Sequence, residues 1–253
     1  MTLALITGGS EGIGLELAKC FARDGTDLIL TARDMEKLQK AKQLLEDTFA
    51  VDVTVIGKDL SLPHSAAELY EELKHRKIDY VINNAGLGTA DAAWRIPPEQ
   101  DEAMINVNIT AVTVLTSLFL RDMLERNSGT IMNVASTGAF LPGPYIASYY
   151  ASKAYVLRYT EAVAEEVRGS GVHVCCLCPG PAATSFYRKS RQSIPAFAMK
   201  AEDCAVYAYE KMKSGQTVII PGMINRLSRL VPKKPAMYFV KKMKKKKGAV
   251  TNR

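Results

Sequence analysis

The chain contains five places where a lysine follows a tyrosine by four residues, and one of these pairs also has a serine thirteen residues before its tyrosine. The pairs are Tyr70/Lys74, Tyr149/Lys153, Tyr207/Lys211, Tyr209/Lys213 and Tyr238/Lys242. Only Tyr149 has a serine, Ser136, thirteen residues before it. On a helix, positions four apart share a face, so Lys153 would lie beside the Tyr149 phenol. A cation about 4 Å away is worth about 4 kcal/mol, which would lower the phenol pKa by about 3 and make it usable near neutral pH.

A glycine-rich segment at residues 7–14 has the residue types that a pyrophosphate site needs. It joins an apolar run at 3–7, expected to be a strand, to apolar residues at helical spacing over 11–24. Gly8 permits a tight turn, Gly12 a close approach of backbone N–H groups, and Gly14 close packing of helix on strand. The helix N-terminus then faces the phosphates, which Ser10, Glu11 and Ile13 would border. A plain glycine-rich turn is the alternative, but the position at the first strand-to-helix turn favours dinucleotide binding.

Arg33 follows the second expected strand, 27–32, where a dinucleotide-binding fold distinguishes its two cofactors. An acidic residue there accepts hydrogen bonds from the ribose 2′-hydroxyl, whereas an arginine can pair with a 2′-phosphate. The sequence therefore favours NADP(H), with NAD(H) as the alternative. Asp34 is expected to cap the next helix instead. A solvated surface arginine is the simpler interpretation of Arg33.

Strand and helix patterns alternate along the chain up to residue 220. Strands are expected at 3–7, 27–32, 51–57, 78–83, 129–135, 172–178 and 216–220, and helices at 11–24, 34–48, 63–76, 99–126 and 148–168. The strands are apolar on both alternating faces, as in a sheet covered on both sides. This pattern predicts an α/β, doubly wound (Rossmann-type) parallel sheet of about seven strands with helices on both faces. We expect one catalytic domain at 1–222 with a substrate lid at about 184–200, and a C-terminal tail at 223–253.

Composition limits the classes of function. The chain has 253 residues, 47% of them hydrophobic, and no apolar run expected to be long enough to span a membrane. The N-terminus has no secretory signal, so we expect a cytoplasmic protein with reduced cysteines. The three histidines and five cysteines have no metal-ligand spacing, so no metal is expected. Residues 1–210 hold 20 basic and 26 acidic side chains, which argues against a general nucleic-acid-binding surface.

Taken together, these motifs resemble the short-chain dehydrogenase/reductase family. Further segments that carry the resemblance, in family order, are Asn83-Asn84-Ala85-Gly86, Asn106-Val107-Asn108 and Pro179-Gly180-Pro181-Ala182-Ala183-Thr184. The resemblance implies a nicotinamide cofactor and oxidation or reduction of a small carbonyl or alcohol substrate. It also implies a homodimer or homotetramer formed through the two long helices. A cofactor-binding sensor or scaffold without strong catalysis is the alternative function, although such proteins usually lose the tyrosine or the lysine.

The resemblance also implies a role for each matching residue. Tyr149 would be the acid/base, Lys153 would lower its pKa and hold the nicotinamide ribose, and Ser136 would orient the substrate oxygen. Asn108 would support a proton relay, because it keeps the family spacing of 28 residues to Ser136, which Asn106 does not. The remaining cofactor contacts implied are Asp59 at the adenine, Asn84 and Gly86 along the cofactor, and Pro179, Gly180, Ala182 and Thr184 around the nicotinamide.

One feature departs from the NADP-preferring members of the family, which often carry a basic residue within the glycine turn. Here the corresponding positions are Ser10 and Glu11. The prediction of NADP(H) therefore depends mainly on Arg33, with Lys37 as a second basic residue nearby in the sequence.

The lid and the tail carry the least specific signals. The lid mixes apolar side chains with Arg188, Lys189 and Arg191, which suits an apolar carbonyl compound that could carry an acidic group. A helix packed on the body would have the same composition. Residues 211–253 hold 13 basic and no acidic side chains, interleaved with apolar ones. A basic amphipathic helix of this kind can lie on an anionic membrane surface, pack on the body, or stay disordered.

Overall fold

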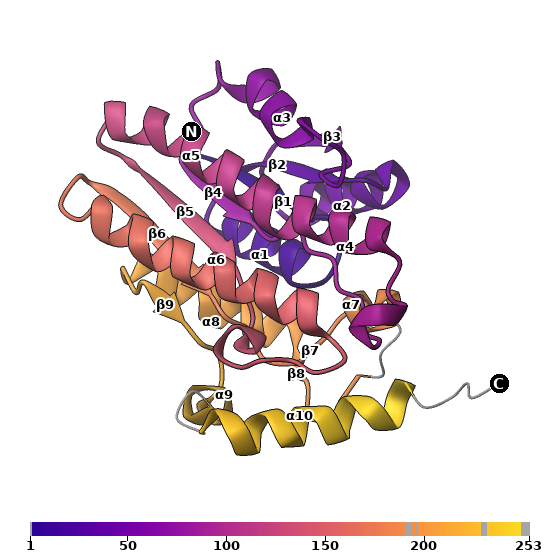
Figure 1. Ribbon diagram of the computed structural model, residues 1–253. Coiled ribbons are helices and arrows are strands. Elements are labelled where there is room, and N and C mark those ends of the chain that lie inside the picture. The colour runs from indigo at the N-terminus through magenta and orange to yellow at the C-terminus, as the bar shows by residue number, and fades with distance from the viewer. Residues whose placement is uncertain (1, 191–193, 196, 229–231, 249–253) are drawn as a thin grey trace.

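A seven-stranded parallel sheet forms the centre of the molecule (Figure 1). The computed structural model describes residues 2–190, 194–195, 197–228 and 232–248. The strand order is β3-β2-β1-β4-β5-β6-β9. Their bounds are β1 Leu3–Thr7, β2 Asp27–Ala32, β3 Val53–Gly57, β4 Tyr80–Asn83, β5 Gly129–Val134, β6 Val172–Leu177 and β9 Val218–Ile219. The predicted α/β class is therefore confirmed.

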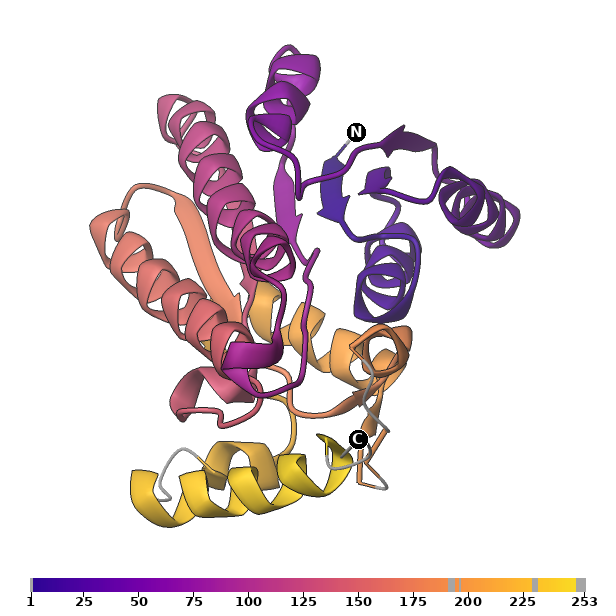
Figure 2. The same ribbon diagram turned by 45° about the vertical axis from the view of Figure 1, so that its right-hand side comes forward.

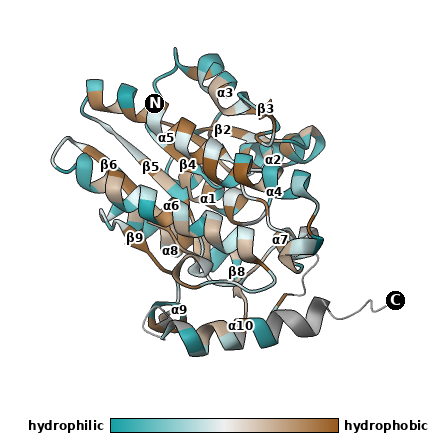
Figure 3. Ribbon diagram, in the orientation of Figure 1, coloured by the Kyte–Doolittle hydropathy of each residue, from teal (hydrophilic) through white to brown (hydrophobic). Residues whose placement is uncertain are grey.

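Helices cover both faces of this sheet, as Figure 2 shows. One face carries α1 (Gly12–Arg23), α2 (Met35–Thr48) and α8 (Ala201–Lys213). The other carries α3 (Ser65–Leu73), α5 (Ala111–Glu125) and α6 (Ala147–Glu166), with α4 (Pro98–Ile105) leading into α5. Figure 3 shows hydrophobic residues concentrated on the strands and hydrophilic ones on the outer helices.

The two cores follow from the pleat of the strands. In β1, Ala4 and Ile6 belong to the core under α1, α2 and α8, whereas Leu3 and Leu5 belong to the opposite core. Neighbouring strands divide in the same way, because successive side chains of a strand point to opposite faces. Burial on two sides thus explains why apolar residues occupy successive positions along the strands.

All strands are parallel, but the direction in which successive strands are added to the sheet reverses between β1 and β4. β2 and β3 extend the sheet to one side of β1, and β4, β5, β6 and β9 extend it to the other. Thr7 and Asn83 are paired at the carboxyl ends of β1 and β4. In open α/β sheets, ligands bind at the crevice outside such a reversal.

The long helix expected over 99–126 is interrupted. Between α4 and α5, a π-helical turn covers Asn106–Thr110. An 18-residue window within Pro98–Glu125 has a mean hydropathy of 1.7, so by length and composition alone this stretch could span a membrane. The expectation that no run is long enough was therefore wrong, although α5 packs against the sheet and α3, which accounts for much of its apolar character.

The C-terminal part contains elements that the sequence did not predict. A two-stranded parallel sheet joins β7 (Ala182–Ala183) to β8 (Met199–Lys200), with the short helix α7 (Ser185–Lys189) between them. This is the segment expected to form the lid. Two further helices, α9 (Met223–Ser228) and α10 (Lys233–Gly248), follow β9.

Candidate active site

A cavity of about 620 Å³ lies at the carboxyl ends of β1, β2, β4 and β5, where the strand order reverses. Its walls come from the turn after β1, the segments after β2, β3, β4 and β5, the start of α6, and the segment from Pro179 to Tyr187. Every cofactor-binding and catalytic residue predicted from the sequence lines this cavity, apart from Gly14 and Asn108. Those two lie directly behind its wall.

The glycine turn forms one wall of the cavity and has the geometry that a phosphate site requires. Gly8 and Gly12 have positive φ angles of 66° and 61°, which other residues rarely adopt. A side chain at Gly14 would overlap the carbonyl oxygen of Gly8. No side chain of the described residues caps the N-terminus of α1, so its first N–H groups are available to an anion. The turn therefore fits a dinucleotide pyrophosphate.

Lys153 lies at the opposite end of the cavity from Arg33 and is almost fully buried, with an exposed fraction of 3%. Its Nζ donates a hydrogen bond of 2.8 Å to the carbonyl oxygen of Val134 and lies 5.8 Å from the centre of the Tyr149 ring. Burial lowers the pKa of Lys153 to about 8, since the charged form loses its hydration. The ammonium group is thus held in place at the buried end of the cavity.

The surroundings of Tyr149 alter its acidity. Burial raises its pKa above the ordinary value of a tyrosine, and a hydrogen bond with Ser136 only partly opposes this. At neutral pH the phenol therefore carries its proton. Lys153 is not among the groups that shift the Tyr149 pKa, so its role in lowering that pKa stays a prediction. Ser136 is positioned as the N-cap of a 3-10 helix, Thr137–Phe140, where its Oγ accepts a hydrogen bond from the Gly138 N–H.

Asn108 lies in the π-helical turn and has no exposed surface. Its Oδ1 accepts a hydrogen bond from the Leu87 N–H at 2.8 Å, and its Nδ2 donates to the Leu87 carbonyl and to Ser152 Oγ, both at 2.9 Å. A Cβ at Gly86 would lie 3.6 Å from Asn108 Oδ1 and 3.4 Å from Lys153 Nζ. Gly86 therefore leaves open the space between the lysine and the asparagine. Sequence reasoning missed Ser152 and Leu87, which fix Asn108.

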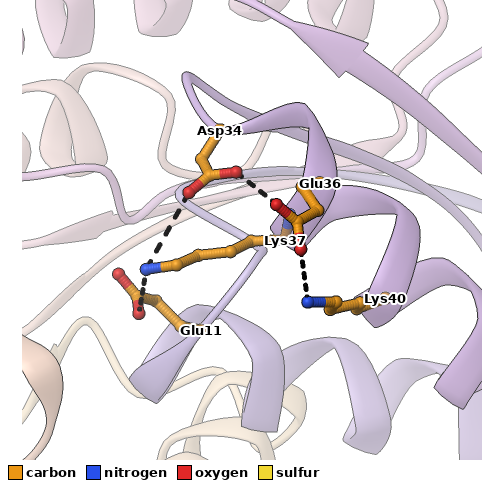
Figure 4. Close-up of polar contacts among 5 residues, drawn as sticks. All are labelled: Glu11, Asp34, Glu36, Lys37 and Lys40. Atoms are coloured by element: carbon orange, nitrogen blue, oxygen red, sulfur yellow. Dashed lines mark hydrogen bonds and ion pairs between the residues drawn. The ribbon is translucent and has the colours of Figure 1, made fainter.

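Charged side chains gather at the end of the cavity formed by the segments after β2 and β3, which we call the adenine end after the contact that the resemblance implies for Asp59. Arg33 is exposed and forms no ion pair with any residue that the structure describes. Lys37 Nζ lies 3.1 Å from Glu11 and 4.0 Å from Asp34, as Figure 4 shows. Asp34 also caps α2 through the Lys37 N–H, as the sequence predicted. Arg33 is consequently the cation that remains available for a 2′-phosphate, while two carboxylates partly neutralise Lys37.

Asp59 borders the same end of the cavity. One of its carboxylate oxygens, Oδ1, accepts hydrogen bonds from the N–H and the hydroxyl of Ser61 at 3.0 and 2.7 Å. These bonds fix the orientation of the carboxylate. Asp59 thus lines the same cavity as Arg33, and its contact with the adenine stays a prediction.

Aromatic side chains surround the other end of the cavity, next to Tyr149. The Phe186 ring lies 5.3 Å from the Tyr149 ring, and a Cβ at Gly88 would lie 2.5 Å from Phe186 Cζ. The Tyr150 ring packs beside Gly138 and Gly143, where a Cβ would come within 2.9 and 2.5 Å of it. Neither Tyr150 nor the glycines around it stood out in the sequence as part of a site. The side chains of Arg188 and Lys189, and all of Arg191, lie outside the described residues.

The fold and the site together define a dinucleotide-binding oxidoreductase, with a glycine turn at one end of its cavity and a tyrosine, a lysine and a serine at the other. The family profile described as short chain dehydrogenase matches residues 2–195. The chain belongs to the short-chain dehydrogenase/reductase family and is an NAD(P)-dependent oxidoreductase.

Relatives in sequence and structure agree with this assignment. The chain is 37% identical over 186 residues to 2-dehydro-3-deoxy-D-gluconate 5-dehydrogenase of Bacillus subtilis, covering 72% of this chain and 71% of that protein. It is 33% identical over 191 residues to hydroxysteroid dehydrogenase-like protein 1 of Gallus gallus, covering 74% of this chain but only 58% of the relative's length. The structure of a short-chain dehydrogenase from Sphingobium yanoikuyae in complex with NADPH superimposes with a TM-score of 0.86 and 29% identity, covering 91% of this chain and 92% of that one.

Proposed function

We propose that this protein is an NADPH-dependent carbonyl reductase for uncharged, largely apolar carbonyl compounds. The observation that carries the proposal is the division of the cavity into two chemically different ends. Its described charged side chains, apart from Lys153, gather at the adenine end: Glu11, Arg33, Asp34, Lys37, Lys58 and Asp59. The end next to Tyr149 is lined instead by Ile146, Tyr150, Phe186 and Tyr187.

The proposed reaction runs in the direction of reduction, for which a protonated Tyr149 is needed. NADPH, when bound, supplies a hydride to the carbonyl carbon. The Tyr149 phenol holds a proton at neutral pH and donates it to the carbonyl oxygen, which yields the alcohol. Ser136 stabilises the developing negative charge on that oxygen by a hydrogen bond. The Lys153 ammonium then stabilises the phenolate that the proton transfer leaves behind.

The choice of cofactor is supported by Arg33. It is exposed at the adenine end, no described acidic residue pairs with it, and it lies where the 2′-phosphate of NADPH is expected. A charge-assisted hydrogen bond to a phosphate is worth about 1.5–3 kcal/mol, or about 10- to 100-fold in binding.

The test is a panel of ketones and aldehydes assayed with NADPH and with NADH by following loss of the reduced cofactor. Each neutral aryl or alkyl ketone is paired with an analogue that carries a carboxylate at the far end. We expect turnover with NADPH at least about 10-fold faster than with NADH, and faster turnover of the neutral member of each pair. If neither NADPH nor NADH is consumed with any compound of the panel, the proposal is contradicted and a sensor or scaffold with this fold is favoured.

A further inference from the structure

We propose that α9 and α10 together form a docking surface for an anionic lipid bilayer. The proposal does not depend on the reaction proposed above. It begins with α9, which exposes three large apolar side chains to solvent. Met223, Ile224 and Leu227 are 76%, 81% and 57% exposed. Large apolar side chains that are exposed next to one another mark interaction sites on soluble proteins.

The geometry of α9 explains why these side chains face outward. Positions 223, 224 and 227 fall within an arc of about 100° on a helix. Polar side chains on the helix instead contact the body. Arg226 donates a hydrogen bond of 3.2 Å to the Ile220 carbonyl oxygen and another to the Tyr207 hydroxyl, and Asn225 donates one of 2.7 Å to the Pro221 carbonyl oxygen. The apolar face of α9 is therefore left without a described partner while its polar residues fix the helix in place.

α10 runs alongside α9 and adds positive charge (Figures 1 and 2). Ala236 and Val240, one turn apart, are buried. The opposite side of the helix carries Lys234, Lys241 and Lys242, all exposed, around Tyr238, which is 69% exposed. Tyrosine with lysine is the combination found at the headgroup level of membranes.

Charge decides between an anionic bilayer and the other partners that could cover this face. Residues 211–253 hold 13 basic side chains and no acidic one, whereas residues 1–210 have an excess of acidic over basic side chains. A second copy would bring an equally basic surface against this one. A nucleic acid would satisfy the lysines but would leave the apolar face of α9 exposed. An anionic bilayer satisfies both the lysines and the apolar side chains.

The surface lies next to the wall of the cavity. A side chain at Gly180, which lines the cavity, would overlap Asn225 of α9. Docking through α9 and α10 would therefore bring the aromatic end of the cavity close to the membrane, where apolar carbonyl compounds concentrate.

The test measures binding of the full chain to vesicles of phosphatidylcholine, with and without about 30% phosphatidylserine, by co-sedimentation. We expect binding to the anionic vesicles only, and loss of that binding at high salt. Replacing Lys234, Lys241 and Lys242 together by Gln should weaken it about 100-fold, at about 5-fold for each lysine. The double variant Ile224→Glu/Leu227→Glu should weaken it at least about 10-fold.

Matched controls separate a local effect from general ones. The triple variant Lys40→Gln/Lys74→Gln/Lys77→Gln removes the same charge from exposed positions elsewhere, and Leu44→Glu changes an apolar side chain that is 45% exposed on α2. Both controls should bind vesicles as the unaltered chain does. No binding of the unaltered chain to anionic vesicles would overturn the proposal, as would test variants that bind like the controls. Binding to a DNA duplex, or self-association that the Ile224→Glu/Leu227→Glu variant abolishes, would also overturn it if vesicles are not bound.

Discussion

The two ends of the cavity differ in how far their charged and titratable groups are exposed to solvent. At the end next to Tyr149, that tyrosine is half-buried and Lys153 is buried, and loss of hydration raises the pKa of Tyr149 and lowers that of Lys153, so the neutral form of each is favoured. At the adenine end, Arg33 is exposed and Lys37 is only partly covered by its carboxylate partners. Tyr149 and Lys153 lie where charge is expected to develop during the reaction. Arg33 and Lys37 lie where they are expected to bind the 2′-phosphate, a charge that the cofactor already carries.

This difference predicts how each end responds to substitution. Changes among buried, hydrogen-bonded groups should alter turnover and folding stability together, since desolvated charges are costly. Changes among exposed charges should alter cofactor affinity by smaller factors, depend on salt, and leave stability almost unchanged.

The largest effect is expected for Lys153→Met at the buried end. Turnover should fall by about 10²–10⁴-fold, as is typical when a group that supports proton transfer is lost. Stability should increase, because burial lowers the Lys153 pKa from 10.5 to about 8, which corresponds to about 3 kcal/mol of unfavourable free energy when the lysine is charged. Some of this gain is offset, since the Val134 carbonyl loses its hydrogen bond.

The pH dependence makes this prediction specific. Below a pH of about 8, Lys153 is charged in both the folded and the unfolded chain, so the full cost is present. Between about 8 and 10.5 the unfolded chain binds more protons, so the unaltered protein gains stability with pH and the advantage of Lys153→Met should shrink. Urea unfolding at several pH values measures this. An advantage that grows over that range would contradict the account.

An intermediate effect is expected for Arg33→Ser at the exposed end. The KM for NADPH should rise about 10- to 100-fold, while the KM for NADH and the melting temperature stay nearly constant. Steady-state kinetics with both cofactors measures the change, and Arg95→Ser, at an exposed arginine outside the cavity, is the matched control. An equal rise of the KM for both cofactors would remove Arg33 from the choice between them.

A smaller effect of opposite sign is expected for Glu11→Gln. Its carboxylate lies 3.1 Å from Lys37 Nζ, so the substitution frees the lysine to face the 2′-phosphate. The KM for NADPH should fall by up to about 5-fold at low salt, the scale of a partly exposed ion pair. The same assay at high salt should reduce the difference, and a higher KM for NADPH would contradict this role of Lys37.

The two ends also differed in how far the sequence predicted them. The spacings among Ser136, Tyr149 and Lys153 identified the buried site because a single helix and a neighbouring strand place all three. The Lys37–Glu11 ion pair joins residues 26 positions apart, and only the folded chain brings them together. The surroundings that raise the Tyr149 pKa are likewise set by tertiary packing, which helical spacing alone does not reveal.

The elements of the fold show the same contrast. Apolar runs predicted the seven strands of the main sheet, since burial on both faces leaves a strong pattern. The π-helical turn that holds Asn108 was missed because apolar residues continue at helical spacing through it. β7 and β8 have only two residues each, too few to show any period.

Tyr149→Phe tests most directly the central claim, that the protonated Tyr149 phenol donates the proton in an NADPH-linked reduction. Single turnovers with NADPH and the best neutral ketone of the panel measure the rate, and NADPH fluorescence measures cofactor binding in the same samples. The account predicts a rate at least about 100-fold lower, with NADPH affinity unchanged within about 2-fold. A rate that stays near that of the unaltered protein would contradict it.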